Sequence, residues 1–253
     1  MTVCIIQMNI EWGKIHDNLR HVGQLIDNNP GADLYVLPEM FSTGFNVNPH
    51  GTVDEDGVSL EWMKTKSLKC KAALCGSVAV RVNDEYYNRL YFVTPEGNAF
   101  EYDKRHLFTY GDEHLRYARG EKRVVVEWNE TRILLQTCYD LRFPVFSRNR
   151  NDYDMAIYVA SWPERRHDVW TTLLKARALE NQCYVVGVNR TGDDPHCHYK
   201  GGSVVINPYG KQIAECLDDA ESVSMANIDI QKLNDFRNKF PVLLDADKFR
   251  LVL

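Results

Sequence analysis

The sequence predicts an α/β fold in which helices cover a mixed β-sheet. Short apolar runs alternate with longer amphipathic segments from one end of the chain to the other. The runs are continuous rather than alternating in polarity, which is typical of strands buried on both faces. No linker rich in Ser, Pro or Gly divides the 253 residues, of which 44% are hydrophobic. We therefore expect a single domain over residues 1–253.

The first half of the chain predicts a strand–helix–strand pattern followed by a hairpin. Strands are expected at Val3–Met8, Leu34–Leu37, Ala72–Val80 and Arg89–Thr94, with helices at Lys14–Asn28 and Leu60–Leu68. The first helix ends before Pro30-Gly31, a pair that stops helices. Asn83-Asp84-Glu85 is rich in turn residues and separates two apolar runs, which indicates a hairpin.

The second half repeats this pattern. Strands are expected at Val124–Trp128, Arg132–Thr137, Met155–Ala160, Cys183–Val188, Gly202–Ile206 and Ser222–Ile228, with helices at Pro144–Arg150 and Asp168–Asn181. Asn129-Glu130 is the turn between the first two strands. In the second helix, Val169, Leu173 and Ala176 recur at helical spacing, so we expect them to face the core.

The charge and the cysteine content of the chain indicate its partners and its cellular compartment. The net charge is -5 with no basic stripe, which argues against a nucleic-acid partner. No apolar stretch reaches the roughly 20 residues that span a bilayer, and the N-terminus lacks a signal peptide. The seven cysteines are odd in number and irregularly spaced, which favours a reducing compartment. We expect a soluble cytoplasmic protein.

Cys138 lies where a predicted buried strand ends and a helix begins. A side chain at such a sharp turn is exposed, and the amide of the next residue, Tyr139, can point at an oxyanion. The alternative is a buried structural cysteine, the commoner case for any single cysteine. The neighbouring Asp140 and Arg142 favour the nucleophile, because an ordinary core cysteine has no use for them.

Two further polar residues follow predicted strands. Glu39 comes directly after Leu34–Leu37 and could serve as a general base, or could only cap the following segment. Lys104 lies in a segment crowded with aromatic residues, where a fixed ammonium would stabilise negative charge, although most lysines are solvated. Glu113 could hold that lysine or relay protons.

These motifs together resemble the nitrilase superfamily of carbon–nitrogen hydrolases, which is marked by a Glu–Lys–Cys triad in that chain order. The matching segments are Leu-Pro-Glu39-Met-Phe-Ser-Thr-Gly-Phe, Asp-Lys104-Arg-His-Leu-Phe and Cys138-Tyr-Asp-Leu-Arg-Phe-Pro, and Lys175–Arg190 resembles the family's later helix and strand. The resemblance covers essentially the whole chain. It implies a four-layer αββα sandwich, a homodimer, and Glu113 as the second glutamate.

More narrowly, the chain resembles the omega-amidase branch, whose members hydrolyse the terminal amide of 2-oxoglutaramate and 2-oxosuccinamate through a thioester. This implies a small amide substrate and requires no metal or organic cofactor. Arg165 is the candidate anchor for a substrate carboxylate, unless it is solvated or faces a dimer partner. Candidate pocket walls are the aromatic residues Phe41, Phe45, Tyr110 and Trp162.

Other functions have weaker support in the sequence. A papain-like enzyme would pair Cys138 with His106 or His114, but no protease signature surrounds the cysteine. His196, Cys197 and His198 lack zinc-like spacing and are better explained as turn residues, and Asp193–His198 matches no function. Within the superfamily, an aliphatic amidase, an N-carbamoyl amide hydrolase and a nitrilase stay open. The alternative of another class is a catalytically silent interaction protein.

Overall fold

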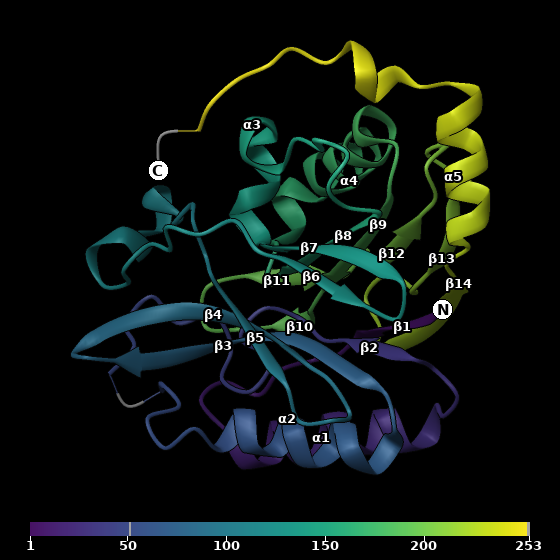
Figure 1. Ribbon diagram of the computed structural model, residues 1–253. Helices are drawn as coiled ribbons and strands as arrows, with labels where there is room; N and C mark the ends of the chain where they lie inside the picture. Colours follow the sequence, from purple (N-terminus) through teal and green to yellow (C-terminus); the bar gives the residue numbers. More distant parts are fainter. Residues whose placement is uncertain (51, 252–253) are drawn as a thin grey trace.

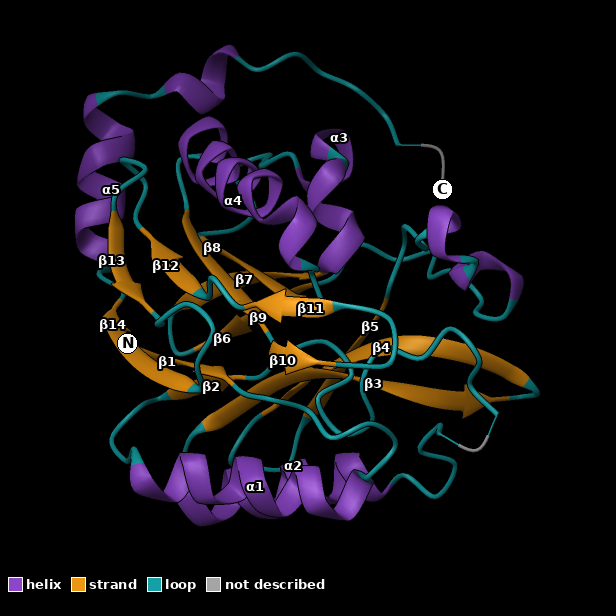
Figure 2. Ribbon diagram, turned by 180° about the vertical axis from the view of Figure 1, so that it is seen from behind, coloured by secondary structure: helices purple, strands orange, loops and turns teal. Residues whose placement is uncertain are grey.

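The computed structural model describes residues 1–50 and 52–251. Two six-stranded sheets face each other, and helices cover the outer face of each (Figure 1). The layer order is therefore helix, sheet, sheet, helix, which confirms the predicted αββα sandwich. Viewed from behind, the same four layers are seen with the helices α1 and α2 on one side and α3 and α4 on the other (Figure 2).

The first sheet has the strand order β14-β1-β2-β3-β4-β5. Its strands are β1 (Thr2–Gln7), β2 (Leu34–Val36), β3 (Ala73–Val82), β4 (Glu85–Val93), β5 (Ala99–Asp103) and β14 (Ser222–Asn227). The central strands β1, β2 and β3 are parallel, and the others pair antiparallel. The connecting helices α1 (Ile15–Asn28) and α2 (Val58–Cys70) cover its outer face.

The second sheet has the order β13-β12-β9-β8-β7-β6. Its strands are β6 (Val125–Trp128), β7 (Thr131–Thr137), β8 (Met155–Ala160), β9 (Tyr184–Asn189), β12 (Val204–Ile206) and β13 (Gln212–Glu215). The strands β7, β8 and β9 are parallel. The helices α3 (Pro144–Ser147) and α4 (His167–Asn181) cover this sheet, and α5 (Ile230–Lys239) runs along one edge.

Three apolar layers hold the sandwich together. The inner faces of both sheets meet in one core, which includes Ile5, Phe92, Ile133 and Val186. A second core lies between the first sheet and α1 and α2, and a third lies under α4. Because side chains alternate along a strand, each continuous apolar run supplies two of these cores at once. This explains why the strands are apolar on both faces.

The structure corrects the predicted core face of α4. Val169, Leu173 and Ala176 are only partly buried, whereas Trp170 and Leu174 are fully buried, one position further along. Val169 and Leu173 still pack against the core beneath α4, so the predicted stripe borders the buried face instead of forming its centre. The buried face also contains polar residues, such as Arg177 and Asn181, whose side chains donate to Leu141 O and Arg177 O, respectively. Counting apolar positions alone could not find such a face.

Other elements were not predicted. They are β5, β13, α5 and the hairpin of β10 (Thr191–Asp193) and β11 (His198–Lys200). All are short or largely polar, so they carry little hydrophobic periodicity. In the described ranges 1–50 and 52–251, no helix is both long enough and apolar enough to cross a membrane.

Candidate active site

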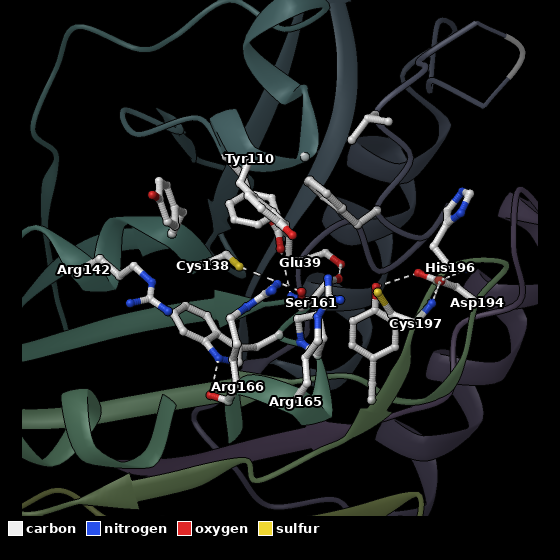
Figure 3. A pocket seen from close by; sticks show the side chains of 18 of the residues that line it. Glu39, Tyr110, Cys138, Arg142, Ser161, Arg165, Arg166, Asp194, His196 and Cys197 are labelled. Atoms are coloured by element: carbon white, nitrogen blue, oxygen red, sulfur yellow. Dashed lines mark hydrogen bonds between the residues drawn. The ribbon is translucent and has the colours of Figure 1, made fainter. Parts of the chain in front are cut away.

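The candidate site lies where the ends of several strands meet. Glu39 follows β2, Lys104 follows β5, Cys138 follows β7 and Ser161 follows β8. They line one cavity of about 280 Å³ between the two sheets' strand ends. The three residues of the predicted triad, which are up to 99 positions apart in the chain, thus share one cavity. Figure 3 shows two of them, Glu39 and Cys138.

A lysine and two glutamates form a buried charged cluster beside the nucleophile. The Nζ atom of Lys104 donates to Glu39 Oε1 at 2.9 Å and to both carboxylate oxygens of Glu113 at 3.0 Å. The three side chains are 1%, 0% and 0% exposed, respectively. The backbone N–H of Ser161 donates to Glu39 Oε2 at 2.8 Å, and that of Phe108 donates to Glu113 Oε2 at 2.6 Å.

The electrostatics keep the lysine charged. Burial opposes the charge on Lys104, but the Glu113 and Glu39 carboxylates outweigh it and raise its pKa. Burial raises the pKa of Glu113, with Glu39 acting in the same direction and Lys104 against it. A buried lysine between two carboxylates therefore remains an ammonium, the form that can stabilise negative charge on a substrate oxygen.

Cys138 is presented by a strained turn. It is the first residue of a five-residue 3₁₀ helix (Cys138–Arg142) and has a φ of +47°, a conformation that costs a non-glycine residue about 1–3 kcal/mol. Its Sγ lies 4.0 Å from Ser161 O. Tyr139, in the first turn of this helix, lines the cavity. Its N–H falls where a helix has no intrahelical acceptor, which suits the predicted oxyanion role.

The surroundings of the Cys138 thiol favour its protonated form. Burial raises its pKa, and the Glu39 carboxylate raises it further by its charge and as a hydrogen-bond acceptor. Lys104 acts in the opposite direction. A thiol of raised pKa needs a base at hand to become a nucleophile. Glu39, the base that the sequence predicts, is the carboxylate that contributes to this raised pKa.

Asp140 connects the cysteine turn with the lysine segment. Its Oδ2 accepts from Thr137 N at 2.9 Å and from Tyr102 O–H at 2.7 Å. Its Oδ1 accepts from His106 N at 2.9 Å and lies 2.7 Å from His106 Nδ1. His106 is thus bound to Asp140 and stacked on Phe143, and neither it nor His114 lines the cavity. The papain-like pairing finds no geometric support.

Three arginines form a cationic wall of the cavity: Arg142, Arg165 and Arg166. The guanidinium of Arg142 lies 5.2 Å from the Trp162 ring, and that of Arg166 lies 5.2 Å from the Phe108 ring. Burial lowers the pKa of Arg166, and the charge of Arg165 adds to this effect. Within residues 1–50 and 52–251, none of the three forms an ion pair with a carboxylate.

The aromatic residues divide into wall and core. Phe45, Tyr110 and Trp162 line the cavity, with Phe45 5.2 Å from Lys104 Nζ and Tyr110 78% exposed at the mouth. Phe41 does not line it, so its predicted place in the wall was wrong. It packs in the core beneath α2, with its ring 6.0 Å from that of Trp62. Successive side chains of the loop that carries Glu39 point to different sides. The closeness of Phe41 to Glu39 in the sequence therefore did not show whether its ring faces the cavity or the core.

The hairpin of β10 and β11 supplies a wall that the sequence did not predict. Asp194, His196, Cys197 and Tyr199 line the cavity. Figure 3 shows the first three of them on the side opposite Arg142. Asp194 Oδ1 accepts from His196 N and Cys197 N, and its Oδ2 accepts from Tyr199 O–H at 2.6 Å. In the part of the chain that the structure describes, no group of three His, Cys, Asp or Glu side chains is placed to hold a metal ion. Asp194-Pro195 indicates a turn, but nothing else in this polar segment indicates that it lines a cavity.

Comparison with known proteins identifies the family. The family model described as "Carbon-nitrogen hydrolase" matches residues 2–238. This chain belongs to the carbon–nitrogen hydrolase family. Among curated members of that family, Omega-amidase YafV of Escherichia coli is 45% identical over 254 residues, which cover 99% of this chain and 98% of the relative. A 2-oxoglutaramate amidase of Bacillus subtilis is 36% identical, with 98% of both chains covered.

Solved structures of the family show the same fold. The carbon–nitrogen hydrolase XC1258 of Xanthomonas campestris superposes with a TM-score of 0.96 and 41% sequence identity, and the match covers 100% of this chain and 99% of that one. The structure of that relative contains an arsenic adduct in its active site. The present chain is therefore an omega-amidase-like carbon–nitrogen hydrolase with the nitrilase-superfamily fold.

Proposed function

We propose that this enzyme hydrolyses the terminal amide of a small 2-oxo acid, such as 2-oxoglutaramate or 2-oxosuccinamate, to the dicarboxylic acid and ammonia. The observation that carries this proposal is the cationic wall beside Cys138. Three arginines that form no ion pair with a carboxylate of the described residues favour an anionic substrate. The two relatives named above, an omega-amidase and a 2-oxoglutaramate amidase, point in the same direction.

In the first half of the proposed reaction, Cys138 Sγ attacks the amide carbon and Glu39 takes the thiol proton. Glu39 Oε1 already accepts from Lys104, so we assign the proton to Oε2, which accepts from the N–H of Ser161, the residue whose carbonyl oxygen lies 4.0 Å from the thiol. The Lys104 ammonium and the Tyr139 N–H stabilise the oxyanion. Glu39 passes the proton to the leaving nitrogen, the C–N bond breaks, ammonia departs and a thioester remains.

In the second half, Glu39 takes a proton from a water molecule while the oxygen of that water attacks the thioester carbon. The same two donors stabilise the second oxyanion. When the C–S bond breaks, the thiolate takes the proton back from Glu39, which restores Cys138 and releases the acid. Glu113 holds the lysine throughout with both carboxylate oxygens at 3.0 Å. The whole cycle consumes one water and uses only side chains and backbone amides of the chain.

Arg165 and Arg166 are the proposed anchors for the substrate carboxylate. Arg165, the residue favoured by the sequence, is exposed at the cavity, whereas Arg166 is half-buried there. A guanidinium that is partly shielded from water binds a carboxylate more strongly than an exposed one. We therefore assign the larger share of carboxylate binding to Arg166. Phe45, Trp162 and Tyr110 are the proposed apolar contacts.

Several further properties belong to this proposal. We expect one functional domain over residues 1–253, a homodimer, and no cofactor. The cytoplasm is the proposed compartment, because all seven cysteines are free thiols, as a reducing environment favours. An aliphatic amidase, an N-carbamoyl amide hydrolase and a nitrilase differ from the proposed enzyme only in substrate, since all use the same nucleophile.

Ammonia release from 2-oxoglutaramate by the wild-type protein and by Cys138→Ala tests the proposal. We expect rapid release from the wild type and none from the variant. Release from neither protein would reject this substrate class, and parallel assays with butyramide, an N-carbamoyl amino acid and a matched nitrile would then identify the alternative. Release that persists in Cys138→Ala would reject the mechanism.

A further inference from the structure

Asn88 is a buried amide that touches both glutamates of the site. It lies on β4, opposite Ala79 of β3, and is 0% exposed. Its Nδ2 donates to Glu39 Oε1 at 2.7 Å and to Glu113 Oε1 at 3.4 Å. Its backbone oxygen accepts from Lys104 N at 3.0 Å. Asn88 thus contacts all three members of the charged cluster while remaining outside the cavity lining.

The orientation of this amide follows from its neighbours. Carboxylates only accept hydrogen bonds, so the NH₂ group must face Glu39 and Glu113. As a result Asn88 Oδ1 is buried with no partner among the described residues. Leaving a buried acceptor unsatisfied costs free energy. A side chain chosen only to fill space on β4 would be apolar and would avoid that cost.

The contacts of Asn88 also decide which oxygen of Glu39 is free. Among the described residues, Oε1 accepts from both Asn88 and Lys104, whereas Oε2 accepts from Ser161 N. The carbonyl oxygen of the same Ser161 lies 4.0 Å from the Cys138 thiol. Because Ser161 contacts both groups, the less occupied Oε2 is the oxygen that we assign to the thiol.

We propose that Asn88 is a positioning residue that saturates Glu39 Oε1 and thereby directs Oε2 to the proton of Cys138. The amide also shares the excess negative charge of the buried cluster, in which two carboxylates face one ammonium. A neutral donor does this without adding a charge that burial would penalise. The inference rests on the proposed function, because it takes Glu39 as the base.

Asn88→Leu tests the role, since leucine has a similar shape and no donor. Expected is a fall in kcat of about 10- to 100-fold with KM nearly unchanged, the size of a lost hydrogen bond to a charged group. The acid limb of the kcat profile moves to higher pH, because the carboxylates lose a donor that favours their ionised form. Rates are divided by the number of Cys138 thiols titrated, so that misfolded protein does not count.

Leu90→Ala is the matched control. Leu90 lies two residues further along β4, on the same face, and is fully buried in the apolar core between the sheets. We expect it to lower Tm but to leave kcat per titrated site and the acid limb unchanged. If Asn88→Leu behaves like Leu90→Ala, the amide is only structural and the proposal is wrong. Asn88→Ala, which only removes atoms, takes its place if the leucine variant does not fold.

A second readout needs no substrate of the enzyme. The rate at which iodoacetamide alkylates Cys138 reports proton removal from the thiol, whichever amide the enzyme hydrolyses. We expect alkylation of Asn88→Leu near pH 7 to be at least tenfold slower than that of the wild type. An unchanged rate would overturn the role of Asn88. Failure of 2-oxoglutaramate as a substrate would overturn only the proposed function.

Discussion

The two sheets enclose one cavity but bring different side chains to it. The first sheet and its loops supply Glu39, Lys104 and Glu113, which are fully buried and satisfy one another. The second supplies the strained Cys138 and the cationic wall, whose arginines have no carboxylate partner in the described chain. Glu39, Lys104 and Glu113 are therefore already held in place by one another. The arginines of the cationic wall, in contrast, would gain an anionic partner from a negatively charged substrate. We therefore expect changes in the first sheet to alter kcat and changes in the wall to alter KM.

The largest expected effect comes from removing a charge beside the thiol. Glu39→Gln and Lys104→Met should each lower turnover by about 10³-fold or more, since one removes the proposed base and the other the proposed oxyanion donor. Their effects on the thiol are opposite in sign. Glu39 raises the pKa of Cys138 and Lys104 lowers it, so the alkylation midpoint should fall in Glu39→Gln and rise in Lys104→Met. Midpoints that move in the same direction would contradict the assigned electrostatics.

Glu113→Gln should have an intermediate effect. The variant keeps an acceptor for Phe108 N but loses a charge that raises the pKa of Lys104, so the ammonium is held less firmly. We expect kcat to fall about 10- to 100-fold with little change in KM. Steady-state kinetics measure this, with Glu121→Gln on the exposed surface as the control. A change confined to KM would show that Glu113 belongs with recognition instead.

Changes in the wall should be smaller and specific to charged substrates. Arg166→Gln is expected to raise KM for an anionic amide about tenfold, and Arg165→Gln only about two- to threefold, because Arg165 is more exposed. Neither should change the kinetics of an uncharged amide such as butyramide, which serves as the internal control. Equal losses on both substrates would mean that the arginines support the fold rather than bind a carboxylate.

The smallest effect separates two neighbouring aromatic residues. Phe41→Leu should cost about 1 kcal/mol of stability, or ~2–4 °C in Tm, and leave kcat and KM unchanged, because Phe41 lies in the core beneath α2. Phe45→Leu should change kcat or KM and leave Tm nearly unchanged, since the Phe45 ring contacts the Lys104 ammonium and lines the cavity. Thermal melts and steady-state kinetics of both variants measure this. Altered kinetics in Phe41→Leu together with a lowered Tm in Phe45→Leu would contradict the placement of the two rings.

Residues at strand ends were the ones that the sequence could predict. Glu39, Lys104 and Cys138 each follow an apolar run or a strand, and strand ends converge in a covered sheet. The motif resemblance then supplied their order and the αββα layers. The positions of strand ends can be predicted from local sequence, because a buried strand is a run of consecutive apolar residues.

The residues that the sequence did not predict depend on contacts between distant segments. Asn88 lies inside a strand and matters only because Glu39 and Glu113, 49 and 25 positions away, approach it. The hairpin around Asp194 lines the cavity only through the folding of the second sheet. Phe41 was assigned to the wrong layer for the same reason, since the path of a loop determines where its side chains point.

The central claim is that Cys138 forms an acyl-enzyme, and hydroxylamine partitioning tests it most directly. Hydroxylamine competes with water for a thioester and gives a hydroxamate. We predict that 2-oxoglutaramate and the matching terminal methyl ester give the same ratio of hydroxamate to acid at each hydroxylamine concentration, because both pass through one thioester. Ratios that differ between the amide and the ester would contradict a common acyl-enzyme.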